Sequence, residues 1–114
     1  MMNNKIIFVA CDASNLNEIK RILKHTQTKK LKVIPKFGLQ FFYSKNGRKF
    51  LENFKNDYWL DLKINDIPQT ISSALSSIKD LKKIKYITVM ASVGLKGLKA
   101  FQKQALKINK SIIV

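Results

Sequence analysis

The chain has 114 residues, of which 46% are hydrophobic and 25% are charged. This length and composition fit one globular domain and exclude a disordered or fibrous protein. The longest apolar run, residues 6–11, is far shorter than the roughly 18–20 residues that cross a bilayer, so we expect no membrane span and no membrane partner. The single cysteine cannot form an internal disulfide and, with a single histidine, cannot complete a zinc site. A cytoplasmic protein is therefore expected.

The formal net charge of +15 results from 22 basic and 7 acidic residues. Such a charge raises the question of nucleic-acid binding, but Arg21 and Arg48 are the only arginines and every other basic residue is a lysine. Arginine is preferred where phosphates or bases are recognised by paired hydrogen bonds. Because the lysines are spread evenly over the chain, we interpret them as a solvated surface that attracts anionic small molecules, and we expect no nucleic-acid partner.

The first 25 residues predict a strand followed by a helix. Residues 5–11 are almost continuously apolar, which is typical of a strand covered on both faces. Asp12 ends this run, and Ser14 or Asn15 then provides an N-cap for the helix. His25 is expected at the exposed end of that helix, in a structural rather than a catalytic position. The apolar face of the helix consists of Leu16, Ile19, Ile22 and Leu23.

Three further strand and helix pairs follow, and the chain then begins another strand. The predicted strands comprise residues 31–36, 58–63, 85–91 and 111–114. The first of the three helices, residues 40–54, has a potential break at Asn46 and Gly47, and Pro68 suits the first turn of the second. The residues expected to be buried in the second helix are Ile71, Leu75 and Ile78. Those of the third helix are Leu98, Phe101, Ala105 and Ile108. The opposite, solvated face of the third helix carries Lys96, Lys99, Lys103 and Lys107.

Four strand–helix units and the start of a further strand predict an α/β protein with parallel strands and right-handed crossovers. Two arrangements of such a sheet remain possible: a small open sheet, or part of an eight-stranded barrel. A complete barrel requires about 250 residues and at least about 200, so this chain would form about half of one. A chain that ends within an apolar strand exposes a sheet edge, and we therefore expect it to be truncated.

Charged residues gather where the predicted strands end. Asp12, Asp61 and Asp66 lie at or just after the carboxyl ends of strands, and Lys36 and Lys63 lie at strand ends as well. In parallel α/β proteins these ends form a common rim, at which barrels carry their chemistry. A single residue such as Asp12 is equally well explained as a helix cap or a turn residue. Five charged residues at one rim favour a functional site.

The segment from Asp61 to Asp66 is the most informative part of the sequence. Residues two apart in a strand share a face, so Asp61 and Lys63 project together while Leu60 and Leu62 face the other way. Burying an acid beside a lysine is costly unless the two pair. The pair is either an ordinary ion pair at a strand end or a proton donor held next to a fixed negative charge.

Four motifs occur in the order and approximate spacing of a known family: FVACD at 8–12, KFG at 36–38, DLKINDIPQT at 61–70 and TVMAS at 88–92. On these residues the chain resembles the orotidine 5'-phosphate decarboxylases over essentially its whole length. The related 3-keto-gulonate-phosphate decarboxylases share the DxKxxD pattern but fit KFG and IPQT less well. The resemblance implies a (β/α)8 TIM barrel, of which residues 1–114 would be the N-terminal half, as a single domain of about four βα units plus the start of strand five.

The resemblance further implies a cofactor-free decarboxylation of orotidine 5'-phosphate to uridine 5'-phosphate, a step of pyrimidine biosynthesis. Lys36, Asp61, Lys63 and Asp66 would form the alternating charge array of the family. Lys63 would be the acid that protonates C6 of the pyrimidine as carbon dioxide leaves. Asp61 would crowd the substrate carboxylate and keep Lys63 charged. Neither a metal nor an organic cofactor is expected, since fixed charges stabilise the C6 carbanion.

Substrate contacts and a protein partner are also implied by the resemblance. Asp12 and Lys36 would hold ribose hydroxyls of the substrate. Asp66, Ile67 and Thr70 would reach into the site of a second subunit, so a homodimer is expected. Binding of the remote phosphate would drive catalysis at the reacting end of the substrate.

Two departures from the family pattern limit the expected activity. Met90 stands where the family usually carries a histidine, and the later strands, which hold the phosphate and provide a mobile lid in the family, have no counterpart in residues 1–114. We therefore expect the chain alone to be a weak or inactive catalyst. Because four βα units bury their inner faces only if something closes the open side of the sheet, we also expect the chain to dimerise, aggregate or stay partly disordered at its ends. Two alternatives remain: a related sugar-phosphate decarboxylase that requires magnesium, and a non-catalytic, self-associating half-barrel.

Overall fold

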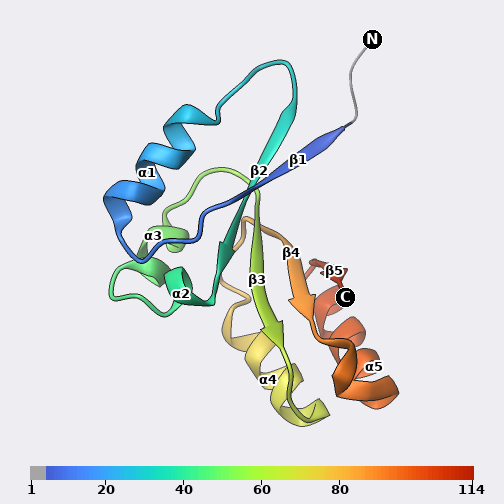
Figure 1. The fold of residues 1–114 in the computed structure, drawn as a ribbon. Coiled ribbons are helices and arrows are strands. Elements are labelled where there is room, and N and C mark those ends of the chain that lie inside the picture. Colours follow the sequence, from blue (N-terminus) through green and yellow to red (C-terminus); the bar gives the residue numbers. More distant parts are fainter. Residues whose placement is uncertain (1–4) are drawn as a thin grey trace.

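A computed structural model describes residues 5–114, in which one parallel sheet carries its strands in the order β1-β2-β3-β4-β5. Figure 1 shows how helices alternate with these strands along the chain. The strands are β1 (Ile6–Ala10), β2 (Lys32–Gly38), β3 (Tyr58–Ile64), β4 (Ile84–Val89) and β5 (Ser111–Ile113). The helices are α1 (Leu16–His25), α2 (Leu39–Phe42), α3 (Gly47–Glu52), α4 (Pro68–Ser77) and α5 (Gly94–Lys107), with a 3-10 helix at Ala91–Val93. Four βα units and a fifth parallel strand are the arrangement of half a (β/α)8 barrel, so the predicted fold class is confirmed.

The hydrophobic core lies on the side of the sheet that the helices cover. The pairing of β2, β3 and β4 aligns Phe37, Leu60 and Ile87 in one row across the sheet, and all three are fully buried. Aromatic rings surround Phe37 at centroid distances of 5.2 to 6.1 Å; they belong to Phe41, Phe50, Phe54 and Tyr58. The helices complete this core with Ile19, Ile71, Leu75, Ile78, Phe101 and Ala105. The apolar helix faces predicted from the sequence are therefore confirmed.

Asn15, and not Ser14, is the N-cap of α1. The side chain of Asn15 accepts hydrogen bonds from the backbone N–H groups of Asn17 at 2.8 Å and of Glu18 at 3.4 Å. These bonds satisfy two of the N–H groups that the first turn of a helix leaves without a partner. His25 ends the helix in an exposed position, as predicted.

The predicted helix over residues 40–54 is divided into α2 and α3. Gly47 begins α3 and is buried, because the chain there passes very close to the end of α2. A Cβ atom at this position would lie only 1.8 Å from the carbonyl oxygen of Phe41, so glycine is required. Pro68 lies in the first turn of α4, as predicted.

The fourth strand and its helix follow the sequence pattern closely. β4 ends at Val89, two residues before the predicted end, and the chain continues in the 3-10 helix. α5 buries Phe101 and Ala105 and exposes the four lysines of its opposite face. No helix within residues 5–114 has the length and apolar character needed to span a membrane.

The prediction that the first strand is covered on both faces is wrong for the described residues. Ile6, Ile7 and Phe8 are 38%, 43% and 40% exposed. β1 lies at the edge of the sheet and pairs only with β2, so fewer elements of residues 5–114 pack against it than against the central strands. An apolar sequence indicates what a strand is able to bury, and not which elements are present to cover it.

The face of the sheet opposite the core carries three aromatic rings. Leu60 belongs to the core, so the preceding Trp59 projects from the other face. The ring of Phe8 packs edge-on against Trp59 at 5.1 Å and against Tyr86 at 5.4 Å. In a closed barrel this face would line the interior.

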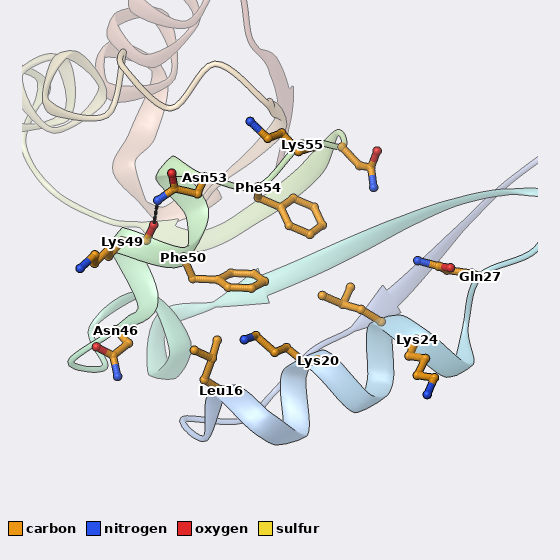
Figure 2. A pocket seen from close by; sticks show the side chains of 12 residues that line it. Leu16, Lys20, Lys24, Gln27, Asn46, Lys49, Phe50, Asn53, Phe54 and Lys55 are labelled. Atoms are coloured by element: carbon orange, nitrogen blue, oxygen red, sulfur yellow. Dashed lines mark hydrogen bonds between the residues drawn. The ribbon is translucent and has the colours of Figure 1, made fainter.

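A hollow of about 760 Å³ lies on the helical side of the protein, between α1 and α3 (Figure 2). Its lining combines the apolar side chains of Leu16, Phe50 and Phe54 with four lysines, Lys20, Lys24, Lys49 and Lys55. None of the site residues predicted from the sequence lines this hollow.

Candidate active site

Three charged side chains meet at the carboxyl ends of β2 and β3. Oδ2 of Asp61 accepts a hydrogen bond from Nζ of Lys36 at 3.0 Å and another from Nζ of Lys63 at 2.6 Å. The parallel pairing places Lys36 beside Trp59 and Gly38 beside Asp61, which brings the ends of the two strands together. The structure thus joins three of the five charged residues predicted at the rim.

Asp61 is the buried member of this cluster. Its side chain is 4% exposed, against 21% for Lys36 and 55% for Lys63. Burial alone would raise the pKa of the Asp61 carboxyl, but hydrogen bonds from Lys63 and Lys36 outweigh burial and hold this pKa below its usual range. Asp61 is therefore a fixed negative charge at neutral pH, held between two ammonium groups.

The second carboxylate oxygen of Asp61, Oδ1, is buried and accepts no hydrogen bond from the described residues. An unsatisfied buried acceptor costs about 1–3 kcal/mol, and more when it is charged. Such groups are rare in folded proteins and are often explained by a functional role. This oxygen is therefore an acceptor that the ion pairs leave unused, and the nearby Thr88 hydroxyl also lowers the pKa of the carboxyl.

Lys63 has an unusual backbone conformation. Its φ angle is +48°, in the left-handed region, and the pairing of β3 with β4 shifts register between Leu60 and Ile64. Residues other than glycine rarely adopt this region, and those that do are concentrated at functional sites. The predicted contact between Asp61 and Lys63 is confirmed, but it forms in an irregular part of the strand. Leu60 and Leu62 belong to or pack against the core, as predicted.

Asp12 lies at the same rim, at the end of β1. A Cβ atom on Gly38 would lie 3.6 Å from Oδ1 of Asp12, so this carboxylate is a close neighbour of the end of β2. The neighbouring Cys11 donates its backbone N–H to the carbonyl oxygen of Lys36 at 2.9 Å. Burial and the charge of Asp12 raise the pKa of the Cys11 thiol to about 11, which excludes it as a nucleophile at neutral pH.

Asp66, Ile67 and Thr70 do not join the charged cluster. All three are exposed, and Oδ1 of Asp66 accepts a hydrogen bond from the backbone N–H of Ile67 at 2.7 Å. They lie just before and within the first turn of α4. Their predicted contact with a second subunit requires such exposure and stays a prediction.

The family model described as "Orotidine 5'-phosphate decarboxylase / HUMPS family" matches residues 5–114. The chain belongs to this family. The resemblance inferred from the four motifs is thereby confirmed.

Relatives with the name orotidine 5'-phosphate decarboxylase are similar to this member of the family. The protein of Prochlorococcus marinus (strain AS9601) is 34% identical over 111 residues, which are 95% of this chain and 44% of the relative. The protein of Bacillus cytotoxicus is 31% identical over 99 residues, or 85% of this chain and 40% of the relative. The protein of Oenococcus oeni is 31% identical over 100 residues, which are 85% of this chain and 42% of the relative. The chain therefore spans less than half the length of these relatives.

Sequence reasoning on this decarboxylase-family chain missed two residues that contact the cluster. The ammonium group of Lys36 lies 5.5 Å from the centre of the Trp59 ring, and Nε1 of Trp59 donates a hydrogen bond to Oγ1 of Thr88 at 2.7 Å. The spacing of Trp59 and Asp61, two residues apart in β3, was an available signal that both share a face. Thr88 opens the TVMAS motif but had no assigned role.

Met90, where the orotidine 5'-phosphate decarboxylases usually carry a histidine, lies just beyond the end of β4. Its side chain is 40% exposed, and its backbone N–H donates to the carbonyl oxygen of Ile64 at 2.9 Å. The thioether of Met90 offers no proton donor, so it cannot replace a histidine in proton transfer.

The chemistry available at the rim is that of ammonium and carboxylate groups. No group of three or more histidine, cysteine, aspartate or glutamate side chains suited to a metal ion occurs in the described part of the chain. An ammonium group held against a buried carboxylate is positioned by it and has a proton to donate.

Proposed function

We propose that this chain supplies the proton donor and its neighbouring charges for the decarboxylation of orotidine 5'-phosphate to uridine 5'-phosphate, a step of pyrimidine biosynthesis. The observation that carries the proposal is the cluster of Lys36, Asp61 and Lys63 at the carboxyl ends of two parallel strands. That position is the one at which barrels carry their catalytic residues. The family to which the chain belongs supports the same reaction.

Lys63 is the proposed proton donor. The bond between C6 of the pyrimidine and the carboxylate carbon breaks, its electron pair stays on C6, and carbon dioxide leaves. The Lys63 ammonium transfers a proton to C6, and the resulting amine regains a proton from water. Asp61, whose Oδ2 lies 2.6 Å from Nζ of Lys63, keeps this ammonium charged and in place.

Asp61 also acts on the substrate in this proposal. Its carboxylate is buried and charged, and a substrate carboxylate brought close to it would be repelled. The repulsion disappears as carbon dioxide leaves, so it raises the energy of the bound substrate relative to the transition state. The second effect of this fixed charge is to hold two lysines at the reacting end, where they offset the negative charge that develops on C6. The reaction is therefore proposed to proceed without a metal or organic cofactor.

Lys36 and Asp12 are proposed to bind ribose hydroxyls of the substrate. Lys36 provides a donor and Asp12 an acceptor, and both lie at the rim formed by β1 and β2. A hydroxyl group is able to accept from the first and donate to the second. The ribose would thereby be fixed next to Asp61.

Asp66, Ile67 and Thr70 are proposed to contact the site of a second subunit in a homodimer. Their exposure at the start of α4 supports this role, since the residues are accessible to another chain. The dimer would place one charged loop of each subunit next to the substrate of the other.

We infer that the chain corresponds to the N-terminal part of the barrel, as one domain, and is weakly active or inactive alone. It spans 44% of the length of the Prochlorococcus relative. In the proposed reaction, the remaining part of the barrel grips the phosphate, and the binding energy of that remote group lowers the barrier at C6. The cytoplasmic location expected from the sequence remains a prediction.

The exposed apolar residues of β1 favour a second candidate function, that of a non-catalytic, self-associating half-barrel. Ile6, Ile7 and Phe8 are each about two-fifths exposed, at an edge of the sheet. Burial of these side chains between two chains would be favourable.

The proposed reaction is tested by the ultraviolet absorbance of orotidine 5'-phosphate, with the 114-residue chain alone and with a chimera that joins it to the remaining part of a curated relative. We expect turnover by the chimera and little or none by the chain alone. Lys63→Ala should lower turnover at least about 100-fold, the contribution of general acid catalysis. Lys99→Ala removes an exposed lysine of α5 and serves as the control. A folded chimera without turnover, or one that Lys63→Ala leaves active, would contradict the proposal.

A further inference from the structure

We propose that Trp59 and Thr88 are positioning residues that hold the Lys36 ammonium against Asp61. The inference deepens the proposed function and rests on it, since it concerns the same charged cluster. Its experimental test requires neither substrate nor turnover.

The first step is the contact of Lys36 with the Trp59 ring. A lysine side chain has four rotatable carbons, and one hydrogen bond to Asp61 leaves its ammonium free to swing toward water. Lys36 and Trp59 are direct neighbours in the pairing of β2 with β3, and Nζ of Lys36 lies 5.5 Å from the centre of the indole ring. Tryptophan is the aromatic side chain that attracts a cation most strongly at this range. The ring thus provides a second attachment for the ammonium.

The second step is that the ring itself is fixed. Its Nε1 donates a hydrogen bond to Oγ1 of Thr88 at 2.7 Å, and Thr88 is 9% exposed on the neighbouring strand β4. The ring of Phe8 also packs edge-on against the indole, at a centroid distance of 5.1 Å and an interplanar angle of 73°. An indole N–H with a buried acceptor prefers one orientation of the ring, because any rotation breaks this bond.

The third step concerns the consequence for the site. A chain of contacts runs from Thr88 on β4 through Trp59 on β3 to Lys36 on β2, and ends at Oδ2 of Asp61. Asp61 Oδ2 also holds Lys63, so the position of Lys36 decides whether this oxygen is shared between two ammonium groups or bound to Lys63 alone. Trp59 and Thr88 would in this way influence the proposed proton donor without touching the substrate.

Nuclear magnetic resonance of the 114-residue chain provides two direct measurements of this arrangement. A Lys36 ε-methylene group above the indole ring is shifted upfield by the ring current. The carboxyl carbon of Asp61 records its own titration. In Trp59→Leu we expect the upfield shift to disappear and Asp61 to titrate at higher pH, because one of its two lysine partners is released. Trp59→Phe keeps an aromatic face and should restore part of both effects.

Tyr43→Leu is the control, since it removes an exposed aromatic ring that packs on Phe42 and is not part of the sheet. It should leave the titration of Asp61 and the shift of Lys36 unchanged. Thr88→Val keeps the shape of the side chain and removes the acceptor of the indole N–H. Since Thr88 also lowers the pKa of Asp61 directly, this variant is judged by the indole and Lys36 resonances and not by the titration of Asp61. We expect it to move the indole N–H resonance and to reduce the upfield shift of Lys36.

The inference would be overturned by a folded Trp59→Leu variant in which Asp61 titrates as in the wild type, or by a folded Thr88→Val variant in which the upfield shift of Lys36 is unchanged. It would also be overturned by a wild-type chain in which Lys36 has no ring-current shift. A chimera without decarboxylase activity would contradict the proposed reaction but leave these measurements intact, and the two failures are therefore distinguishable.

Discussion

Asp61 links the charge of the site to the stability of the protein. Its pKa is lowered from 3.8 in the folded chain, because the hydrogen bonds of Lys63 and Lys36 outweigh the effect of burial. A carboxyl group of this kind contributes stability above its unfolded pKa, and the contribution is lost as the pH falls through the lower folded pKa. Asp61→Asn should therefore lower the free energy of unfolding at pH 7 by about 1–2 kcal/mol. This loss is smaller than that expected for a fully buried ion pair, because solvent screens the half-exposed Lys63. The difference from the wild type should narrow from about pH 5 downward.

Urea unfolding at a series of pH values measures this difference. Asp66→Asn is the matched control, since it removes a nearby exposed carboxylate that contacts the N–H of Ile67 and neither lysine of the cluster. A pH-independent difference between Asp61→Asn and the wild type would show that the ion pairs do not stabilise the fold.

Single residues of the site differ in how far the sequence predicted them. The contact of Asp61 with Lys63 was predicted because residues two apart in a strand share a face. The contact of Lys36 with Asp61 joins two strands, and it was predicted only through the family resemblance, because it depends on a register that no local pattern contains. The left-handed backbone of Lys63 was equally hidden, since nothing in a lysine side chain favours that conformation.

At the scale of elements, the start of α1 offers a direct test between two residues that the sequence left equivalent. Asn15 caps the helix through two hydrogen bonds, whereas the neighbouring Ser14 makes no such contact with the first turn. Asn15→Ala should lower the free energy of unfolding by about 1 kcal/mol, the typical value of an N-cap. Ser14→Ala should change it by less than about 0.5 kcal/mol. Thermal and urea unfolding of both variants measure the two effects, and an equal loss would contradict the assignment of the cap.

Hydrophobic periodicity predicted the order and approximate ends of the described elements, because a helix or strand must present its apolar residues on one side. The break between α2 and α3 was predicted from Asn46 and Gly47, but not its cause, the close approach of Gly47 to the carbonyl oxygen of Phe41. That approach depends on how two helices pack, and a linear sequence carries no distance between them. The hollow between α1 and α3 was unpredicted for the same reason.

At the scale of the whole molecule, the pattern of burial reflects half of a barrel. The core between sheet and helices is complete enough to bury Phe37, Leu60 and Phe101 fully. On the other face of the sheet, the ring of Phe8 packs edge-on against Trp59 and Tyr86 and is itself 40% exposed. The sequence predicted that Phe101 and the apolar residues of β1 are buried, but the covering of a strand depends on elements that lie beyond it in space. That is why the prediction for β1 was wrong.

The exposed apolar residues of β1 lead to a prediction for the isolated chain in solution. An edge strand with free backbone hydrogen-bonding groups and exposed apolar side chains is a template for pairing with another chain. We expect sedimentation velocity at micromolar concentrations to detect dimers or larger species. Phe8→Lys should raise the dissociation constant at least about tenfold, which corresponds to the loss of about 1.4 kcal/mol of apolar burial.

Leu106→Lys provides the matched control for this association. Leu106 is 71% exposed on α5, more than the 40% of Phe8, and lies on the helical side of the sheet. Association through β1 and the uncovered sheet face should be unchanged by this variant, because that surface does not include α5. If Phe8→Lys and Leu106→Lys weaken association equally, the chains associate through general surface hydrophobicity and not through β1. A chain that sediments as a monomer at high concentration would show instead that two-fifths exposure of three apolar residues is tolerated, and would remove the support for a self-associating half-barrel.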